Sequence, residues 1–387
     1  MLTFLTPVSD GMLTHRDQLP AGTLGKHIMP HTGQEGLPDM EGVKLAIIGV
    51  KETRSVIADT QKSIDFDSCR KAFYSLYPGN WDSNIVDLGD IDPGNTPDDS
   101  RFALKEIVSN LIKANVIPII LGAGQNMAYA QYRAYDNLDQ MVSVVNVDYR
   151  FDIGDADLPI SDKSYVGKMI VDPPYNLFNY AVMGYQSFFN APEEINLMEK
   201  LFFEAYRLGE VTADVTIAEP VLRSADMVIF DATAIKSSEM SYENNDNPNG
   251  FDGREICALA RYAGISSQVT SFGVYELGQD ITRSSAMLVG QMLWYFIEGV
   301  NFRISEDFSN ESLFTTYVVP MDGAELTFKK SHKSERWWME LPFFSNNNNK
   351  SKRYALLPCT YVDYIDACNQ KIPERWLRAR IKNEGKM

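Results

Sequence analysis

The stretch Val142-Ser-Val-Val-Asn-Val-Asp-Tyr-Arg-Phe-Asp152 decides the fold, because an apolar run of strand length ends there in charged residues. Such a continuous run predicts a strand that is buried on both faces, as in a parallel sheet. Similar runs recur along the chain, and each predicts another buried strand. They occupy residues 43–50, 84–88, 116–121, 227–230 and 268–275.

Helical patterns separate these runs. Residues 96–114 open with Thr-Pro-Asp-Asp, where an early proline and first-turn acids indicate a helix start. Further helices are predicted near residues 125–135 and 254–262, and residues 284–300 predict a buried helix. Strands that alternate with helices predict an α/β fold with a parallel sheet covered on both faces.

The end of the chain has a different character. Residues 321–387 hold three of the five tryptophans, Trp337, Trp338 and Trp376, and a run of four asparagines at 346–349 that predicts an exposed loop. We therefore predict an α/β domain over residues 1–320 and a Trp-rich C-terminal extension over 321–387 that packs on the main body.

The composition of the chain limits the classes of partner that it can bind and the cellular compartment in which it is expected. The chain has 36 Lys and Arg against 52 Asp and Glu, a net charge of −16, which argues against nucleic acid or an anionic membrane surface as a partner. No signal peptide or transmembrane run is evident and the four cysteines are scattered, so we predict a cytoplasmic protein. No histidine lies between residues 32 and 331, so a metal site in the central body would need other ligands.

Polar residues follow four of the predicted strands. In open α/β sheets ligands bind beyond the carboxyl ends of the strands, so these positions are the candidates for a site. The segments are Gly122-Ala-Gly-Gln125, Asp148-Tyr-Arg-Phe-Asp152, Asp231-Ala-Thr-Ala-Ile-Lys236 and Val274-Tyr-Glu276.

In order, strand context and spacing, these four segments resemble the motifs of the ureohydrolase superfamily, which includes arginase, agmatinase and, most similar here, formimidoylglutamase. The resemblance covers roughly residues 40–300 and implies a three-layer arginase-like fold. It also implies a site with two Mn²⁺ ions held by two His and four Asp, where a metal-bridging hydroxide attacks a guanidine-type carbon. Members of the family often form trimers or hexamers, which implies a homo-oligomer.

The departures from the family motifs fall on the metal ligands. Carried over position by position, Asp148, Asp152 and Asp231 keep their ligand identity. The two His positions hold Gln125 and Arg150. The fourth Asp position holds Thr233, and a further Asp position holds Lys236. The resemblance therefore implies a degenerate dimanganese site.

The side chain of Arg150 indicates which kind of interaction takes the place of the metal ions. A guanidinium offers no lone pair and stays charged, so it can donate hydrogen bonds to Asp148, Asp152 and Asp231. We predict an ion-pair network in place of the metal cluster, with Lys236 adding positive charge, and no metal cofactor. Two alternatives stay open. One residual metal, with Mn as the alternative cofactor, could bind Asp148, Asp152 and Asp231 with help from Gln125, or these acids could simply cap helices.

Glu276 occupies the position at which family members contact the guanidinium or imino group of the substrate. Here it could receive a small cation, pair with Arg150, or stand exposed at a strand end. The sequence therefore predicts a ureohydrolase-like pseudoenzyme that binds a small molecule or a protein. The alternative is a metal-dependent hydrolase of a linear amidine or guanidine C–N bond with a reduced metal site.

Overall fold

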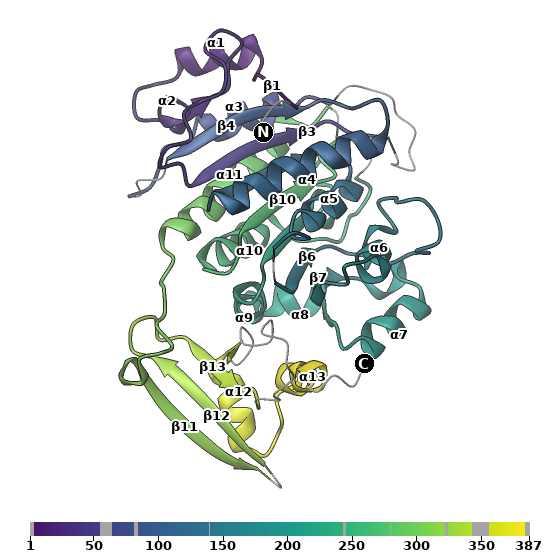
Figure 1. Ribbon diagram of the computed structural model, residues 1–387, viewed down its shortest axis with the longest axis vertical. Coiled ribbons are helices and arrows are strands. Elements are labelled where there is room, and N and C mark those ends of the chain that lie inside the picture. Colours follow the sequence, from purple (N-terminus) through teal and green to yellow (C-terminus); the bar gives the residue numbers. More distant parts are fainter. Residues whose placement is uncertain are drawn as a thin grey trace.

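A single large sheet forms the centre of the computed structural model (Figure 1). The structure describes residues 4–54, 64–80, 84–138, 140–242, 245–278, 280–321, 324–342 and 356–383. Within these residues the central sheet has ten strands in the order β1-β4-β3-β5-β10-β9-β6-β7-β8, and β2 also pairs with β4. All its pairs are parallel except β1 with β4. The predicted α/β class is confirmed.

The predicted strands form close to their expected bounds, because their apolar side chains are buried on both sides of the sheet. The strands are β1 (Leu5–Thr6), β2 (Met29–Pro30), β3 (Leu45–Val50), β4 (Ile85–Ile91), β5 (Ile117–Gly122), β6 (Val142–Val147), β7 (Leu177–Tyr185), β8 (Glu204–Arg207), β9 (Met227–Asp231) and β10 (Ser271–Tyr275). The sequence analysis missed the two-residue strands β1 and β2 and the longer strands β7 and β8.

Helices cover both faces of this sheet, as predicted, and an apolar cluster lies under each layer. One face carries α3 (Asp67–Tyr74), α8 (Leu208–Ala213), α9 (Ala218–Arg223), α10 (Gly253–Ile265) and α11 (Arg283–Asn301). The other face carries α4 (Pro97–Lys113), α5 (Ala128–Arg133), α6 (Tyr165–Val171) and α7 (Pro192–Lys200). The short α1 (Asp10–Gln18) and α2 (Leu24–His27) pack beside α3. In the described residues, no helix is both long and apolar enough to cross a membrane.

The C-terminal extension is a second sheet with two helices, and Figure 1 shows it at one end of the molecule. Its elements are β11 (Phe314–Met321), β12 (Ala324–Ser331), β13 (Trp337–Glu340), β14 (Leu356–Cys359), α12 (Tyr361–Cys368) and α13 (Glu374–Asn383). Because β11 crosses residue 320, we propose that the extension begins after α11. The predicted loop at 346–349 lies outside the described residues.

Polar and cationic side chains attach the extension to the main body. Arg223 of α9 donates to the carbonyl oxygens of Trp337 (3.1 Å) and Cys359 (3.0 Å), and its guanidinium lies 4.5 Å from the Trp338 ring centre. Trp337, Trp338 and Trp376 are all buried. Trp337 and Trp376 belong to an apolar cluster within the extension itself, whereas Trp338 contacts Arg223 of the main body.

Helix α13 contacts the start of β8, the last strand of the central sheet. Arg375 Nε donates to Glu204 Oε2 at 2.7 Å, and Arg378 donates to the carbonyl oxygen of Phe203, next to that strand. Lys382 donates to Asn179 of the neighbouring strand β7. Burial alone would raise the pKa of Glu204, but Arg375 and the Tyr206 hydroxyl outweigh it and lower the pKa to about 2.

The Glu204–Arg375 pair yields a prediction about pH. Because the folded-state pKa of Glu204 lies below its unfolded value of about 4.3, the pair stabilises the protein above that value and is lost as the pH falls toward about 2. We expect Arg375→Gln to lower the free energy of unfolding by roughly 3–5 kcal/mol at pH 7, because a buried carboxylate loses its partner. Urea midpoints at pH 7 and pH 3 will show a smaller difference between variant and wild type at pH 3.

Lys371→Gln is the control for this prediction. Lys371 pairs with Asp366 at 3.7 Å on the surface of the same extension, and its side chain is 73% exposed. Its replacement should change the free energy of unfolding by less than about 1 kcal/mol. Equal effects of the two substitutions would show that the Glu204–Arg375 pair does not hold the extension in place.

Candidate functional site

The predicted site residues meet at the carboxyl edge of the central sheet. Strands β5, β10, β9 and β6 are neighbours in the sheet, so the segments that follow them lie next to one another. Gln125 opens the short helix η1 (Gln125–Met127) after β5, and Asp231 is the last residue of β9. Asp148 and Asp152 follow β6, and Glu276 follows β10. The strand order thus brings together segments that are far apart in the sequence.

Asp148 is fully buried at the centre of this edge and accepts three N–H donors. Gln125 Nε2 donates to it at 2.6 Å, Asn146 Nδ2 at 2.9 Å, and the backbone N–H of Arg150 at 2.9 Å. The Gln125 side chain therefore acts as a hydrogen-bond donor to the carboxylate. Asn146 was not among the predicted site residues, although a polar residue inside an apolar strand is a usable signal.

The predicted ion pairs of Arg150 are not formed, and that prediction is wrong. The Arg150 guanidinium lies 4.9 Å from the ring centre of Tyr149 and 5.4 Å from that of Phe189. Its buried Nε has no hydrogen-bond partner among the described residues, which include Asp148, Asp152 and Asp231. The aromatic rings attract the cation, and this contact takes the place of a hydrogen-bonded ion pair with the acids. Arg150 therefore acts on the carboxylates only through its charge, at longer range.

Asp152 and Asp148 form a pair of buried carboxyl groups that interact electrostatically, and Asp152 Oδ2 has no hydrogen-bond partner among the described residues. Burial raises the pKa of Asp152 well above its ordinary value, the charges of Asp148 and Asp231 raise it further, and Arg150 offsets part of this. Burial likewise raises the pKa of Asp148 and of Asp231. Two buried carboxyl groups that lie close together share a proton unless a cation neutralises them.

Glu276 belongs to a second carboxyl pair, with Asp162, that the sequence analysis missed. The two carboxyl groups act on each other electrostatically, and they accept N–H groups of consecutive residues. Gln125 N donates to Glu276 Oε1 at 2.8 Å, and Asn126 N donates to Asp162 Oδ1 at 2.9 Å. Asp162 lies in the loop before α6, where no sequence motif marks it. Of the alternatives left open for Glu276, pairing with Arg150 is not observed among the described residues, and Asp162 is its neighbour instead.

Two of the acids sit on strained backbone. Asp152 has φ 52° and Glu276 has φ 56°, in the left-handed region that residues with a Cβ atom rarely adopt. Such conformations cost of order 1–3 kcal/mol and concentrate where a side chain must point in one particular direction. The strain is consistent with a site in which the direction of these carboxyl groups matters.

Thr233 and Lys236 follow β9 but play different parts. The Thr233 backbone N–H and hydroxyl both donate to Asp231, at 2.7 and 2.6 Å. Lys236 lines an open hollow with Tyr185 and Arg207, and in the described structure it makes no ion pair with the acids. The expectation that Lys236 neutralises the carboxyl cluster is therefore wrong.

The side chains do not fit a two-manganese centre. Arg150 has no lone pair, the Thr233 hydroxyl donates its proton to Asp231, and the Gln125 amide donates to Asp148. Of the family's six protein ligands only three carboxylates remain. Among the described residues, no group of three His, Cys, Asp or Glu side chains is arranged to hold a metal ion.

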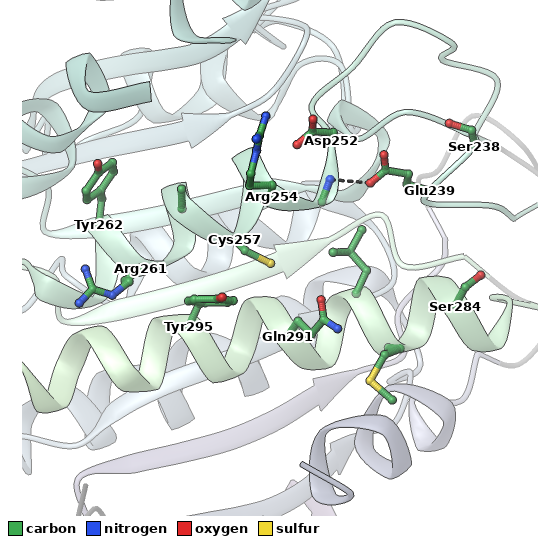
Figure 2. A pocket seen from close by; sticks show the side chains of 14 residues that line it. Ser238, Glu239, Asp252, Arg254, Cys257, Arg261, Tyr262, Ser284, Gln291 and Tyr295 are labelled. Carbon is green, nitrogen blue, oxygen red and sulfur yellow. Dashed lines mark hydrogen bonds between the residues drawn. The ribbon is translucent and has the colours of Figure 1, made fainter. Parts of the chain in front are cut away.

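A separate groove of about 970 Å³ lies away from these acids, between α10 and α11 (Figure 2). Polar and charged side chains such as Arg254, Arg261 and Gln291 surround it, and Cys257 lies at its base. At its rim the Gly253 N–H donates to Glu239 at 2.5 Å, so this acid caps the start of α10. None of the predicted site residues lines the groove.

The carboxyl cluster leads to a prediction about stability. Because the folded-state pKa of Asp152 is raised, its carboxyl group contributes stability at low pH that is lost as the pH rises. We expect Asp152→Asn, which removes the charge and tolerates a positive φ, to raise the free energy of unfolding by about 0.5–2 kcal/mol at pH 7.5. Urea midpoints at pH 7.5 and pH 4 will show a smaller gain at pH 4.

Asp157→Asn provides the control for this variant. Asp157 is an exposed acid in the same loop, and its substitution should be nearly neutral at both pH values. A loss of stability in Asp152→Asn at pH 7.5 would contradict the interpretation, because it would mean that a bound cation holds the Asp152 carboxylate ionised.

Comparisons with known proteins find formimidoylglutamases that are similar in sequence and in fold. The formimidoylglutamase of Streptococcus gordonii is 23% identical over 291 residues, which cover 68% of this chain and 86% of that protein. The crystal structure of Trypanosoma cruzi formiminoglutamase with Mn²⁺ superposes with a TM-score of 0.61 and 17% identity, over 69% of this chain and 96% of that one. The formimidoylglutamase of Bacillus subtilis gives a TM-score of 0.64 and 16% identity, over 76% of this chain and 99% of that one.

The predicted resemblance over residues 40–300 is confirmed by a sequence match to the Arginase family over residues 48–297. These residues hold all four strand-end segments, and the extension lies outside the match. The chain belongs to the arginase family.

Proposed function

We propose that this arginase-family chain binds a small organic cation at the carboxyl edge of its sheet and does not hydrolyse it through a pair of manganese ions. The observation that carries the proposal is the bonding of the three substituted ligand positions. Gln125 and Thr233 donate to the acids that would otherwise bind metal, and the Arg150 guanidinium lies against the rings of Tyr149 and Phe189. A metal-bound hydroxide would therefore lack its supporting ligands.

The acids favour an organic cation as the ligand. Five carboxyl groups, Asp148, Asp152, Asp162, Asp231 and Glu276, gather at this edge, and among the described residues none of the five forms an ion pair with Lys, Arg or His. Desolvation raises the pKa of Glu276 well above its ordinary value, and the charges of Asp162 and Asp231 raise it further. A ligand with several N–H groups on a delocalised cation, such as an amidinium or guanidinium, would replace the shared protons and satisfy several oxygens at once.

A metal-dependent hydrolase of a linear amidine or guanidine C–N bond is the second candidate. Two observations favour it. Several relatives are named formimidoylglutamase, and Asp148, Asp152 and Asp231 are oxygen ligands of the kind that Mn²⁺ prefers. In that case one metal would draw on these three carboxylates after their present hydrogen bonds rearranged.

We also propose that the protein is cytoplasmic and that it forms a homo-oligomer, with another protein as a further partner. The acidic net charge of −16 supports the exclusion of nucleic acid and anionic membranes. Light scattering of the purified chain tests the oligomer directly.

The first test combines binding and turnover. Titration of the metal-free protein with acetamidine, guanidine or agmatine should give saturable heat, and arginine, agmatine, guanidinobutyrate and formiminoglutamate should yield no product above a protein-free control, even with added Mn²⁺. Glu276→Gln should weaken cation binding at least tenfold, because the ligand loses a charged acceptor. Asp157→Asn should leave the affinity unchanged.

Either half of this test can fail by itself. Turnover that Asp148→Ala abolishes would overturn the non-hydrolytic function and favour the second candidate. No saturable binding of any of the three cations would overturn the ligand class.

The second test restores the family's ligands. The variant Gln125→His/Arg150→His/Thr233→Asp places every family ligand type at its position, so Mn²⁺ should stabilise it by about 2.7 kcal/mol at a concentration one hundred times its Kd. The wild type and Thr233→Asp alone should show little change in urea midpoint with Mn²⁺. Equal stabilisation of wild type and triple variant would mean that Gln125, Arg150 and Thr233 do not exclude the metal.

A further inference from the structure

A hollow of about 390 Å³ opens beside the end of β7 and carries two cationic side chains. Residues at the end of β7, the start of α8 and the loop after β9 surround it, and we call it the basic hollow. Its wall includes Tyr185, Gln186, Ser187, Phe188, Arg207, Leu208, Gly209, Thr212, Lys236, Asn249, Gly250 and Glu255. None of the five clustered acids belongs to it.

Arg207 is held in place at the wall of the basic hollow. Its Nε donates to the Tyr185 hydroxyl at 3.1 Å, and its guanidinium lies 5.8 Å from the centre of the Tyr185 ring. These contacts engage one N–H of the guanidinium, so the remaining donors stay available. In the described part of the chain neither Arg207 nor Lys236 forms an ion pair, although the chain carries 52 acids against 36 basic residues.

Two acidic side chains near the basic hollow, Glu210 and Glu255, each accept a hydrogen bond from a backbone N–H group. Glu210 Oε2 accepts the backbone N–H of Arg207 at 2.8 Å, and Glu255 Oε2 accepts the backbone N–H of Asp252 at 2.9 Å. Both contacts belong to helix starts, at α8 and α10, where the orphan N–H groups favour a carboxylate. The positive charge of the hollow is therefore not cancelled by a side chain bound to either cation.

Hydrogen bonds hold the uncharged side chains in the wall of the basic hollow in place. Gln186 Nε2 donates to the carbonyl oxygen of Asn249 at 2.6 Å, and Asn249 Nδ2 donates back to Gln186 Oε1 at 3.2 Å. This reciprocal pair joins the end of β7, where Tyr185 bonds Arg207, to the loop after β9, which carries Lys236. A binding site with a rigid wall loses little entropy when its ligand arrives.

We propose that the basic hollow binds the oxyanion group, carboxylate or phosphate, of a small ligand. Arg207 offers a planar fork of donors and Lys236 a mobile ammonium group, which is the pairing that recognises such groups. The Ser187 and Thr212 hydroxyls line the same hollow and add neutral donors. Its volume suits a small molecule or one end of it. The inference does not depend on the proposed function, because it uses none of the acids.

The test titrates the full chain with inorganic phosphate and, separately, with succinate, at constant ionic strength set by chloride. Binding is followed by calorimetry. We expect saturable binding of at least one anion, and at least tenfold weaker binding in both Arg207→Gln and Lys236→Gln. Arg207→Lys should recover part of the affinity, since it restores the charge without the fork. Saturation by phosphate alone or by succinate alone identifies the source of the oxyanion, and either result supports the site.

Lys113→Gln is the matched control, because Lys113 is an exposed cation at the end of α4, away from the hollow. Its affinity for either anion should equal that of the wild type. The proposal is overturned if neither anion binds above the chloride background, or if Arg207→Gln and Lys236→Gln bind as tightly as Lys113→Gln. Melting temperatures of all variants will show that each is folded.

Discussion

Carboxyl groups gathered at one edge of a parallel sheet, away from water and from basic side chains, are the constraint around which the described structure is organised. Ionised carboxylates in such a place repel one another and lose their hydration, so each must find a hydrogen-bond donor, a proton or a cation. Asp148 finds three N–H donors, Asp231 finds the hydroxyl and N–H of Thr233, and Glu276 finds an N–H and a second carboxyl. The strained backbone at Asp152 shows that the fold tolerates a local cost to keep this arrangement.

In this setting the replaced ligands have a common effect. Under the proposed match to the family's ligand positions, Gln125 and Thr233 supply hydrogen atoms in place of lone pairs, and the observed result is a hydrogen-bonded network around Asp148 and Asp231. Arg150 acts differently, because its guanidinium lies against aromatic rings and influences the acids only through its charge. The network explains how this edge of the sheet can stay folded without a metal ion, and it leaves an excess of negative charge for a ligand to balance.

Much of this could be predicted from the sequence, and the failures have physical causes. Strands with continuous apolar runs, such as 142–147, were found because they are buried on both faces. Strands β7 and β8 were missed because polar and aromatic residues interrupt their apolar pattern. The positions of the acids follow from strand order, whereas the direction of Arg150 depends on Phe189, which lies 39 residues further along the chain. Asp162 meets Glu276 through a loop, and loops carry no periodic signal.

The contacts of α13 have a consequence for the size of the central sheet. An edge strand presents unpaired N–H and C=O groups that can template pairing with another chain. Here the opposite edge strand, β1, is only two residues long. At the β8 edge, Arg378 of α13 bonds the carbonyl oxygen of Phe203, just before the strand, and Arg375 bonds the Glu204 side chain at its first residue. The extension therefore occupies a carbonyl group at the start of this edge, where the backbone of an added strand would need a free acceptor.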